Sequence, residues 1–450
     1  MHSNRRRFLK SSAAVAAGAL APAIAAGRGG PNDRIRVAVV GLRRRGRDHV
    51  RCLHLLAKEE NLEVAALCDV DEAVLSQQAA EYEKLSGKKA RLLTDVRKLL
   101  EDPSIDAISY ATPDHWHALG TIWACQAGKD VFLEKPASHN IFEGRKMIEA
   151  ARKYRRIVQH GTQSRSNPAM HEGVAKLREG VIGEVYMARG LCFKWRESIG
   201  RLKEEPVPSG VHYDLWTGPA PLKPFARQRF HEYWHFLWDY GNGEIANQGV
   251  HQLDIMRWGL GLDTHPTEIQ SMGGHYIHRD DQETPNTQVA WFRYAGRELV
   301  LQFDVRPWIT NLEAGIGEIY PSRGQQNLVG VIFYGTEGYM VMPGYTCYYT
   351  FLGKNRTPGP KRETAEEPAA SLDHFRNFIR AVRSRKHTDL TADIAEGHLS
   401  AALSHLANIS YRTGQKLRFD PRAERFPNDD EANRLLRCSY RPPFVVPEEV

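Results

Sequence analysis

The feature that most constrains this chain is a glycine-bounded turn between a buried strand and a helix. Residues 35–40, Ile-Arg-Val-Ala-Val-Val, form an apolar run that is typical of a buried parallel strand. Gly41 and Gly46 follow, and helical periodicity occupies residues 48–58. In this context the first glycine makes a tight turn, the last lets helix and strand pack closely, and backbone N–H groups face a pyrophosphate. The pattern predicts a dinucleotide site.

Two residues near this turn bear on which dinucleotide binds. The position that is usually a middle glycine is Arg43, so this side chain must point aside, add positive charge to the phosphate, or mark a weakened site. Asp69 ends the next strand, where an acid can hold both ribose hydroxyls of NAD and would repel the 2′-phosphate of NADP. We expect NAD, with NADP possible because arginines lie nearby. A domain that has lost its nucleotide is the alternative.

Strands and helices alternate as far as residue 160, which predicts a doubly wound parallel sheet and a Rossmann domain over residues 34–160. The expected strands after the first are 62–68, 107–110, 131–133 and 157–159. The expected helices are 48–58, 72–85, 96–100, 119–127 and 141–154.

Residues 161–450 follow a different rhythm, which predicts a second α/β domain with a mainly antiparallel sheet. Turn residues separate the strand-like runs 185–193, 268–276, 288–294, 298–305, 329–334 and 345–351. Helices are expected at 244–260, 372–382 and 392–413, and a surface loop at 353–367. The long polar and aromatic connection 197–240 is expected to be functional, because compact domains seldom keep such loops otherwise.

The first 26 residues have the composition of an export signal. Arg5, Arg6, Arg7 and Lys10 precede an alanine-rich run, and the arginine pair followed by Phe-Leu-Lys resembles a twin-arginine signal. We therefore expect an exported, periplasmic protein; a disordered basic tail is the alternative. Removing these four positive charges from the net charge of +7 leaves +3, which is weak evidence for nucleic-acid binding.

Composition excludes other classes. At 42% hydrophobic and 26% charged residues, the chain is ordinary globular material, and no run of 18 apolar residues predicts a membrane span. The six cysteines are scattered without zinc spacing. We interpret them as buried small hydrophobic residues, although export leaves a disulfide open.

Two further motifs, taken with the nucleotide turn, identify a family. The first is Ala-Thr-Pro-Asp-His-Trp-His at residues 111–117, followed by Glu134-Lys135-Pro136 after a strand, and the second is Gly-Glu-Ile-Ala-Asn-Gln-Gly-Val-His-Gln-Leu-Asp at residues 243–254. Together they resemble the glucose–fructose oxidoreductase and inositol dehydrogenase family (Gfo/Idh/MocA), from about residue 34 to about residue 420. The resemblance implies a Rossmann domain, an open-faced second sheet, and NAD(P)-dependent chemistry on a sugar, cyclitol or polyol hydroxyl.

By this resemblance, Lys135 lies beside the nicotinamide and contacts the reacting oxygen, where a cation stabilises alkoxide charge and can share its proton. His251 falls on the family's active-site histidine and is a candidate base. The family often has Asp four residues earlier, but here Asn247 occupies that position and cannot store a charge. Asp254 shares a helix face with His251, so it either orients the imidazole or forms a helix-face salt bridge.

Further contacts follow from the motifs and the resemblance. We expect the dinucleotide to be bound by Gly41, Arg43, Gly46, Asp69, Thr112, Pro113, His117, Glu134 and Lys135. Five of the nine tryptophans lie between residues 195 and 258, where flat aromatic faces suit a pyranose. The expected substrate contacts are Arg165, Trp195, Tyr213, Trp216, Asn247, His251 and Asp254. No metal-ligand pattern occurs, and we expect no required metal.

These observations predict an exported oxidoreductase that transfers hydride between a carbohydrate or cyclitol carbon and a tightly held nicotinamide cofactor. NAD is not freely supplied outside the cytoplasm, so the cofactor would be recycled in place. The alternatives are a cofactor-neutral, NAD-dependent glycoside hydrolase on the same fold and a sugar-binding protein without catalysis. We also expect a homo-oligomer, because an open sheet face needs cover.

Overall fold

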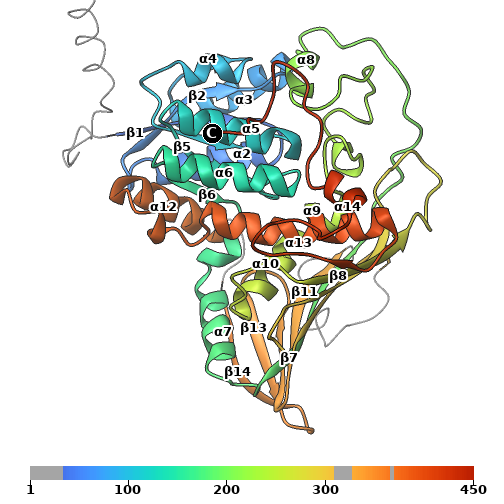
Figure 1. Cartoon of the computed structure of the whole chain (residues 1–450). Helices are drawn as coiled ribbons and strands as arrows, with labels where there is room; N and C mark the ends of the chain where they lie inside the picture. The colour runs from blue at the N-terminus through green and yellow to red at the C-terminus, as the bar shows by residue number, and fades with distance from the viewer. Residues whose placement is uncertain (1–33, 309–326, 365–368) are drawn as a thin grey trace, which may run out of the picture. The chain divides into compact units, whose positions relative to one another are not determined.

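The first sheet positions the glycine turn. The computed structural model describes residues 34–308, 327–364 and 369–450, so the expected export signal lies outside the described residues. The six strands of this sheet are all parallel, in the order β3-β2-β1-β4-β5-β6 (Figure 1). Their bounds are β1 Ile35–Val40, β2 Leu62–Cys68, β3 Arg91–Leu93, β4 Ala107–Tyr110, β5 Asp130–Leu133 and β6 Val158–His160. The order reverses between β1 and β4, which is where doubly wound sheets bind ligands at the carboxyl ends of their strands.

Helices cover both faces of this sheet, as the alternating pattern predicts. Their bounds are α2 Arg45–Leu56, α3 Glu72–Ser86, α4 Val96–Leu100, α5 Asp114–Gln126 and α6 Ile141–Lys153. Helices α4, α5 and α6 share one core with the sheet, and α2 and α3 share the other. The Rossmann prediction is confirmed.

The C-terminal helices also belong to these cores. Helix α12 (Ala369–Ser384) packs on the α2 face, where the Phe375 ring stacks on Phe132 with centroids 4.0 Å apart and planes 17° apart. Helix α13 (Ile394–Thr413) contributes Ile394 to the opposite core. In Figure 1 α13 runs between the two sheets. A division of the chain at residue 160 therefore does not separate its hydrophobic cores.

The second sheet has nine strands in the order β14-β13-β12-β11-β7-β10-β9-β8-β15. Every pairing is antiparallel except that of β10 with β7, so the mainly antiparallel prediction is confirmed. The bounds are β7 Val185–Lys194, β8 Glu268–Gly274, β9 Thr287–Arg293, β10 Val300–Arg306, β11 Asn327–Gly335, β12 Gly338–Met342, β13 Cys347–Leu352, β14 Thr357–Glu363 and β15 Leu417–Arg418.

The two faces of the second sheet differ. Helices α7 (Pro168–Arg178), α10 (Gly249–Gly259) and α13 pack on one face, over buried side chains such as Phe303 and Phe333. On the other face Met272 is 71% exposed and Trp291 is 39% exposed, whereas Leu191, Phe193, Ile332 and Val341 form a small buried cluster. Such apolar exposure is consistent with an open-faced sheet, and its cover by a second copy stays a prediction.

Several elements differ from the sequence expectation, among them β3, α7 and β12, which the sequence did not predict. The helix expected at 244–260 is broken into α9 (Gly243–Asn247) and α10 at Gln248. The surface loop expected at 353–367 contains strand β14, and residues 365–367 lie outside the described residues. Because β14 is an edge strand whose side chains are mostly exposed, it needs no alternating pattern and tolerates its two prolines.

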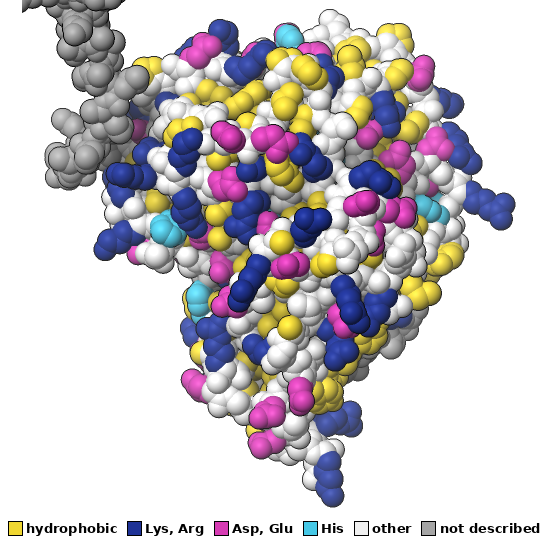
Figure 2. Space-filling model, viewed as in Figure 1, with side chains coloured by type: hydrophobic (Ala, Val, Ile, Leu, Met, Phe, Trp, Pro, Cys, Tyr) yellow, Lys and Arg dark blue, Asp and Glu magenta, His cyan; other side chains and the backbone are white. Residues whose placement is uncertain are grey.

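Short elements complete the described chain, and no disulfide joins the six cysteines, all of which are described. The short elements are α8 Tyr213–Thr217, α14 Asp430–Arg434 and the 3₁₀ turns Gln163–Ser166, Trp234–Phe236 and His387–Asp389. Five cysteines are buried, as expected, and Cys438 is partly exposed. None of the helices described is both long enough and apolar enough to cross a membrane. Figure 2 shows both signs of charge interspersed over the viewed face.

The shared core generates a stability prediction. Phe375→Ala should lower the free energy of unfolding by about 3–5 kcal/mol, because it removes a fully buried ring and leaves a cavity beside Phe132. Urea unfolding measures the loss, and Lys386→Ala, at an exposed position beyond the same helix, is the control. A Phe375→Ala loss no larger than the control's would contradict a shared core.

Candidate functional site

The nucleotide turn requires both of its glycines. Gly41 has φ +80°, and a Cβ there would lie 2.6 Å from the Ala111 carbonyl oxygen. A Cβ on Gly46 would lie 1.7 Å from the carbonyl oxygen of Gly41. The Arg43 side chain is exposed at the mouth of the site and lines the cavity, and its role toward a phosphate stays a prediction.

A cavity of about 370 Å³ opens over this turn, between the carboxyl ends of β1, β2, β4 and β5 and residues 196–235. Thr112 lines it, and its buried Oγ1 has no hydrogen-bond partner within the described chain. Asp69 lines it too, accepting hydrogen bonds from the backbone N–H groups of Leu42 (2.7 Å) and Asp71 (2.9 Å). Burial raises the pKa of Asp69 to about 6. Tight glycines, an unpaired hydroxyl and a strand-end acid fit a dinucleotide.

Glu134 ties the turn to the motif that carries Lys135. Its Oε1 accepts hydrogen bonds from Arg45 Nε (3.1 Å) and Nη2 (3.0 Å) and lies 3.0 Å from His49 Nε2. Burial by itself would raise the pKa of Glu134, but Arg45 and His49 outweigh it and hold that pKa well below the usual value. Arg45 and His49 are supporting residues that sequence analysis missed, because neither stands in a recognised motif position.

The expected dinucleotide contacts around α5 separate into two kinds. Pro113 lines the cavity and precedes the first residue of α5. His117 is fully buried, with Nδ1 2.6 Å from the Pro136 carbonyl oxygen and Nε2 2.9 Å from that of Thr112. His117 therefore holds the two loops in place and is not part of the cavity wall described here.

Lys135 joins the two halves of the site. Its Nζ donates to the Asn247 backbone carbonyl (2.6 Å) and to Asn247 Oδ1 (3.1 Å). Burial lowers the pKa of Lys135, although Glu134 and Asp114 oppose that shift. In an unbroken helix the Asn247 carbonyl would accept from the His251 N–H, but that N–H bonds to the Gln248 carbonyl (3.2 Å) instead. The break between α9 and α10 therefore frees the carbonyl that binds Lys135.

His251 lies on the first turn of α10, buried against the Tyr345 ring at a centroid distance of 5.0 Å. Burial, followed by the charge of Lys135, holds the pKa of His251 well below its usual value, so the imidazole is neutral near pH 7. Its buried Nδ1 has no hydrogen-bond partner among the residues described. A neutral ring with an unpaired nitrogen is able to accept a proton or a hydroxyl hydrogen bond.

Asp254 does not orient His251. Its carboxylate accepts from Arg165 Nε at 3.0 and 2.9 Å and from Ser400 Oγ at 2.6 Å. Arg165 is buried and also pairs with Glu396 (3.1 Å). Arg165 and Asp254, two of the expected substrate contacts, thus bind each other and connect α10 to α13. The geometry therefore supports the interpretation of Asp254 as a salt-bridge residue.

A second set of polar groups near Asn247 escaped sequence analysis. Arg196 donates from Nε and Nη2 to the two oxygens of Glu244, at 3.0 and 2.8 Å. Burial opposes ionisation, but Arg196 and then Lys194 lower the pKa of Glu244 to about 2. Lys194 itself donates to Gln248 Oε1. Glu244 and Gln248 lie within the family motif, so their position in the sequence could have identified them. No sequence pattern identifies their basic partners, Lys194 and Arg196.

The expected aromatic contacts are mostly packed against one another. The Tyr213 and Trp216 rings stack with centroids 5.6 Å apart and planes 13° apart, within a buried cluster on the 197–240 connection. Trp216 also lines the cavity. Trp195 is partly exposed, with its centroid 4.4 Å from that of Trp308. Contact of these rings with substrate stays a prediction.

The connection 197–240, hereafter the cover segment, closes the side of the cavity that Asp69 lines. Hydrogen bonds and an ion pair connect it to the loop after β2, to the glycine turn and to α5. The contacts are His212 N to Val70 O (2.9 Å), Glu72 N to Gly210 O (3.0 Å), His231 Nε2 with Asp71 (2.7 Å), Glu232 with Arg44 (2.7 Å) and Trp116 Nε1 to Leu215 O (3.0 Å). The C-terminal residues hold its far side, since Arg441 pairs with Asp214 (2.7 Å).

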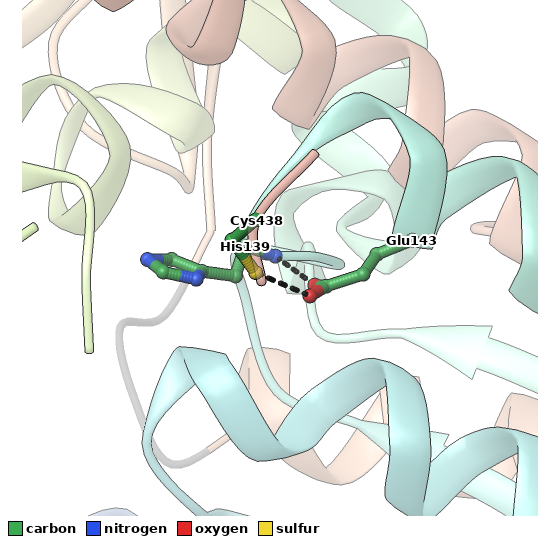
Figure 3. Close-up of side chains that lie close together, drawn as sticks. All are labelled: His139, Glu143 and Cys438. Carbon is green, nitrogen blue, oxygen red and sulfur yellow. Dashed lines mark hydrogen bonds between the residues drawn. The ribbon is translucent and has the colours of Figure 1, made fainter. Parts of the chain in front are cut away.

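Two clusters of metal-ligand type lie elsewhere in the described chain. In the first, Glu143 accepts from the His139 N–H (2.8 Å), Tyr440 Oη (3.1 Å) and Cys438 Sγ (3.8 Å), while the His139 ring points away from the carboxylate (Figure 3). In the second, His265 and His398 each lie 2.8 Å from Glu424, which also pairs with Arg145. A guanidinium on that carboxylate disfavours a metal ion there.

Comparison with known proteins places this geometry in a class. Residues 35–162 match the family model "Oxidoreductase family, NAD-binding Rossmann fold", and residues 180–322 and 337–446 match its "C-terminal alpha/beta domain". The protein is therefore an oxidoreductase with an NAD-binding fold, and it belongs to the Gfo/Idh/MocA family. Residues 2–22 match the twin-arginine translocation signal, which confirms the predicted export route.

Relatives span different shares of the chain. An inositol 2-dehydrogenase of Acidothermus cellulolyticus is 30% identical over 88% of this chain and 96% of its own length. The rhizopine catabolism protein MocA of Rhizobium meliloti is 25% identical, and the chain spans 60% of its length. A glycosyl hydrolase family 109 protein of Shewanella is 28% identical over about half of each chain (48% and 51%).

Solved structures agree on the fold. The WlbA dehydrogenase of Bordetella pertussis, in complex with NADH and UDP-GlcNAcA, has a TM-score of 0.62 at 21% identity and covers 86% of this chain and 99% of its own. A levoglucosan dehydrogenase in complex with NADH and levoglucosan has a TM-score of 0.63 at 16% identity, with coverage of 86% and 99%.

The buried carboxyl of Glu143 generates a pH prediction. Burial raises its pKa from 4.5 to about 7, so this group stabilises the fold fully below pH 4.5 and loses that contribution as pH rises through 7. Relative to wild type, Glu143→Gln should therefore gain up to about 3 kcal/mol in unfolding free energy between pH 5 and pH 8. Urea unfolding at both pH values measures the difference. Glu149→Gln, more exposed on the same helix, should show no such trend; a flat difference for Glu143→Gln would overturn the assignment.

Proposed function

We propose that this protein is a periplasmic dehydrogenase that oxidises a hydroxyl of a sugar or cyclitol and keeps its NAD bound between turnovers. The observation that carries the proposal is the contact of Lys135 with Asn247, which brings the family's lysine and the His251 helix together at the end of the dinucleotide cavity. The net glycoside cleavage considered from the sequence has less support, because similarity to such enzymes covers only about half of the chain.

The dinucleotide would be held by the glycine turn, Thr112 and Asp69, with the cover segment over its adenosine end. Once bound, the nicotinamide supplies the acceptor for the hydride. Above pH 6 the Asp69 carboxylate is ionised, which favours ribose hydroxyls over a 2′-phosphate and supports NAD over NADP. The bonds that hold the cover segment to the turn support slow release of the cofactor.

Lys135 and His251 divide the proton chemistry. Burial lowers the pKa of Lys135, so it gives up a proton more readily than a surface lysine and stabilises the substrate oxygen as negative charge develops. The neutral His251 ring receives or orients the hydroxyl proton. Asn247 contacts Lys135 through a carbonyl and an amide, so it positions the ammonium group without adding a charge.

Removing either group should stop the chemistry and spare the cofactor. We expect Lys135→Ala and His251→Ala each to lower kcat by about 10²–10⁴-fold, because each loses a positioned proton-transfer or charge-stabilising group. If both act on one oxygen, the double variant should lose less than the product of the two. Steady-state turnover measures this, with His387→Ala at an exposed position as control. A His251→Ala enzyme at wild-type rate would exclude the histidine.

Cofactor retention is tested on purified protein. Heat-denatured wild type should release NAD(H) close to one per chain, and NADP(H) as the main nucleotide would contradict the interpretation of Asp69. His231→Ala, which removes the 2.7 Å contact of the cover segment with Asp71, should release its cofactor faster in a dialysis time course. His387→Ala should release it at the wild-type rate. Protein that never carries a nucleotide would refute retention.

A further inference from the structure

The charges beside Lys135 point to an acidic substrate. We propose that the sugar or cyclitol oxidised here carries a carboxylate, and that Lys194 binds it. This inference rests on the proposed function and narrows its substrate class.

Lys194 is placed to reach the substrate. It is the last residue of β7, and the preceding alternate residues Ala188 and Cys192 point into the core beneath α10. Lys194 therefore lies on the same sheet face as the helix that carries His251. Its Nζ donates to the side chain of Gln248, at the break between α9 and α10. Its side chain is partly exposed.

The positive charge of Lys194 is not matched by an acid of its own. Among the residues that the structure describes, no carboxylate lies within ion-pair distance of its Nζ, and its contact is a neutral amide. The nearby Glu244 is held on both oxygens by Arg196. Lys194 also lies close enough to lower the pKa of Glu244, so this one carboxylate faces two basic groups.

Lys135 adds to the imbalance. It binds the carbonyl and amide of Asn247, both neutral. Of the acids nearby, Glu134 is held by Arg45 and His49, and burial raises the pKa of Asp114 well above its usual value although Lys135 opposes that shift. The oxidised nicotinamide beside it carries a further positive charge. A half-buried ammonium group without a counter-charge is costly, and the cost grows when a substrate displaces water. A carboxylate on the substrate would supply the missing negative charge; a neutral sugar would not.

The contacts of the two lysines also indicate how the reacting oxygen and the carboxylate are spaced on the substrate. Lys135 binds Asn247 and Lys194 binds Gln248, so the two ammonium groups reach adjacent residues of one short segment. An oxygen on Lys135 and a carboxylate on Lys194 then belong to the same ring-sized molecule. A sugar acid of the uronic type, with a carboxylate on the ring that bears the reacting hydroxyl, has this arrangement.

The test compares three probes that differ at one carbon: D-glucuronate, D-glucuronamide and D-glucose. Binding to the NAD-loaded wild type is measured by calorimetry and oxidation by nicotinamide absorbance. We expect glucuronate to bind about 10–100-fold more tightly than the amide, the range of a charge-assisted hydrogen bond. That preference should shrink as salt is raised.

Matched variants assign the effect to Lys194. Lys194→Met, which keeps the length and removes the charge, should abolish the preference for glucuronate over the amide, while Lys194→Arg should keep the preference. Lys176→Met, an exposed lysine on α7, should behave as wild type. Retained NAD in each variant shows that it is folded.

The outcomes separate the two proposals. Oxidation of glucose and glucuronate at equal kcat/KM, unchanged in Lys194→Met, overturns the acidic substrate and leaves the dehydrogenase intact. Failure to bind or oxidise all three probes counts against both. A glucuronate preference that survives in Lys194→Met overturns the role of Lys194.

Discussion

The contact between Lys135 and Asn247, on which the proposed chemistry rests, depends on one interrupted ladder of helix hydrogen bonds. A continuous helix through residues 243–259 would satisfy the Asn247 carbonyl internally, and Lys135 would meet only a side chain. The break at Gln248 turns that carbonyl toward Lys135 and leaves Gln248 to hold Lys194. Gly249 makes the restart of the helix possible at this depth, since a Cβ there would lie 2.6 Å from the Phe303 ring. The packing of Gly249 against Phe303 of the second sheet thus fixes the contact between Asn247 and Lys135.

The contact between Lys135 and Asn247 requires a fixed distance between the two sheets. Helices in the last third of the chain set that distance. Helix α12 completes a core of the first sheet, α13 lies against both, and the buried Arg165–Asp254–Ser400 network joins them to α10. Buried ion pairs of this kind contribute little net stability but are costly to break, so they favour one arrangement. A domain boundary drawn along the sequence therefore does not describe the cores, because both cores of the first sheet combine N-terminal strands with C-terminal helices.

Much of this arrangement could be predicted, for identifiable reasons. The parallel sheet came from local signals, above all a strand that ends in Gly41. Lys135 and His251 came from the resemblance of two motifs to a known family, and their roles stay predictions. The helix break was missed because residues 244–260 keep helical periodicity, and only contact with Phe303 makes Gly249 necessary. The pairs Arg196–Glu244 and Arg165–Asp254 join residues 48 and 89 positions apart, and no local pattern specifies such partners. Strand β14 was missed because an exposed edge strand lacks alternation.

Residues 441–444 contact two segments that line the cavity. Arg441 grips the cover segment at Asp214 and Gly218, while Phe444 packs edge-on against Trp116 of α5. The cover segment can therefore move away from the cavity only if the hydrogen bonds of Arg441 break or residues 441–444 move with it. Release of a molecule bound beneath the segment is in this way coupled to the local opening of a contact between residues 223 positions apart.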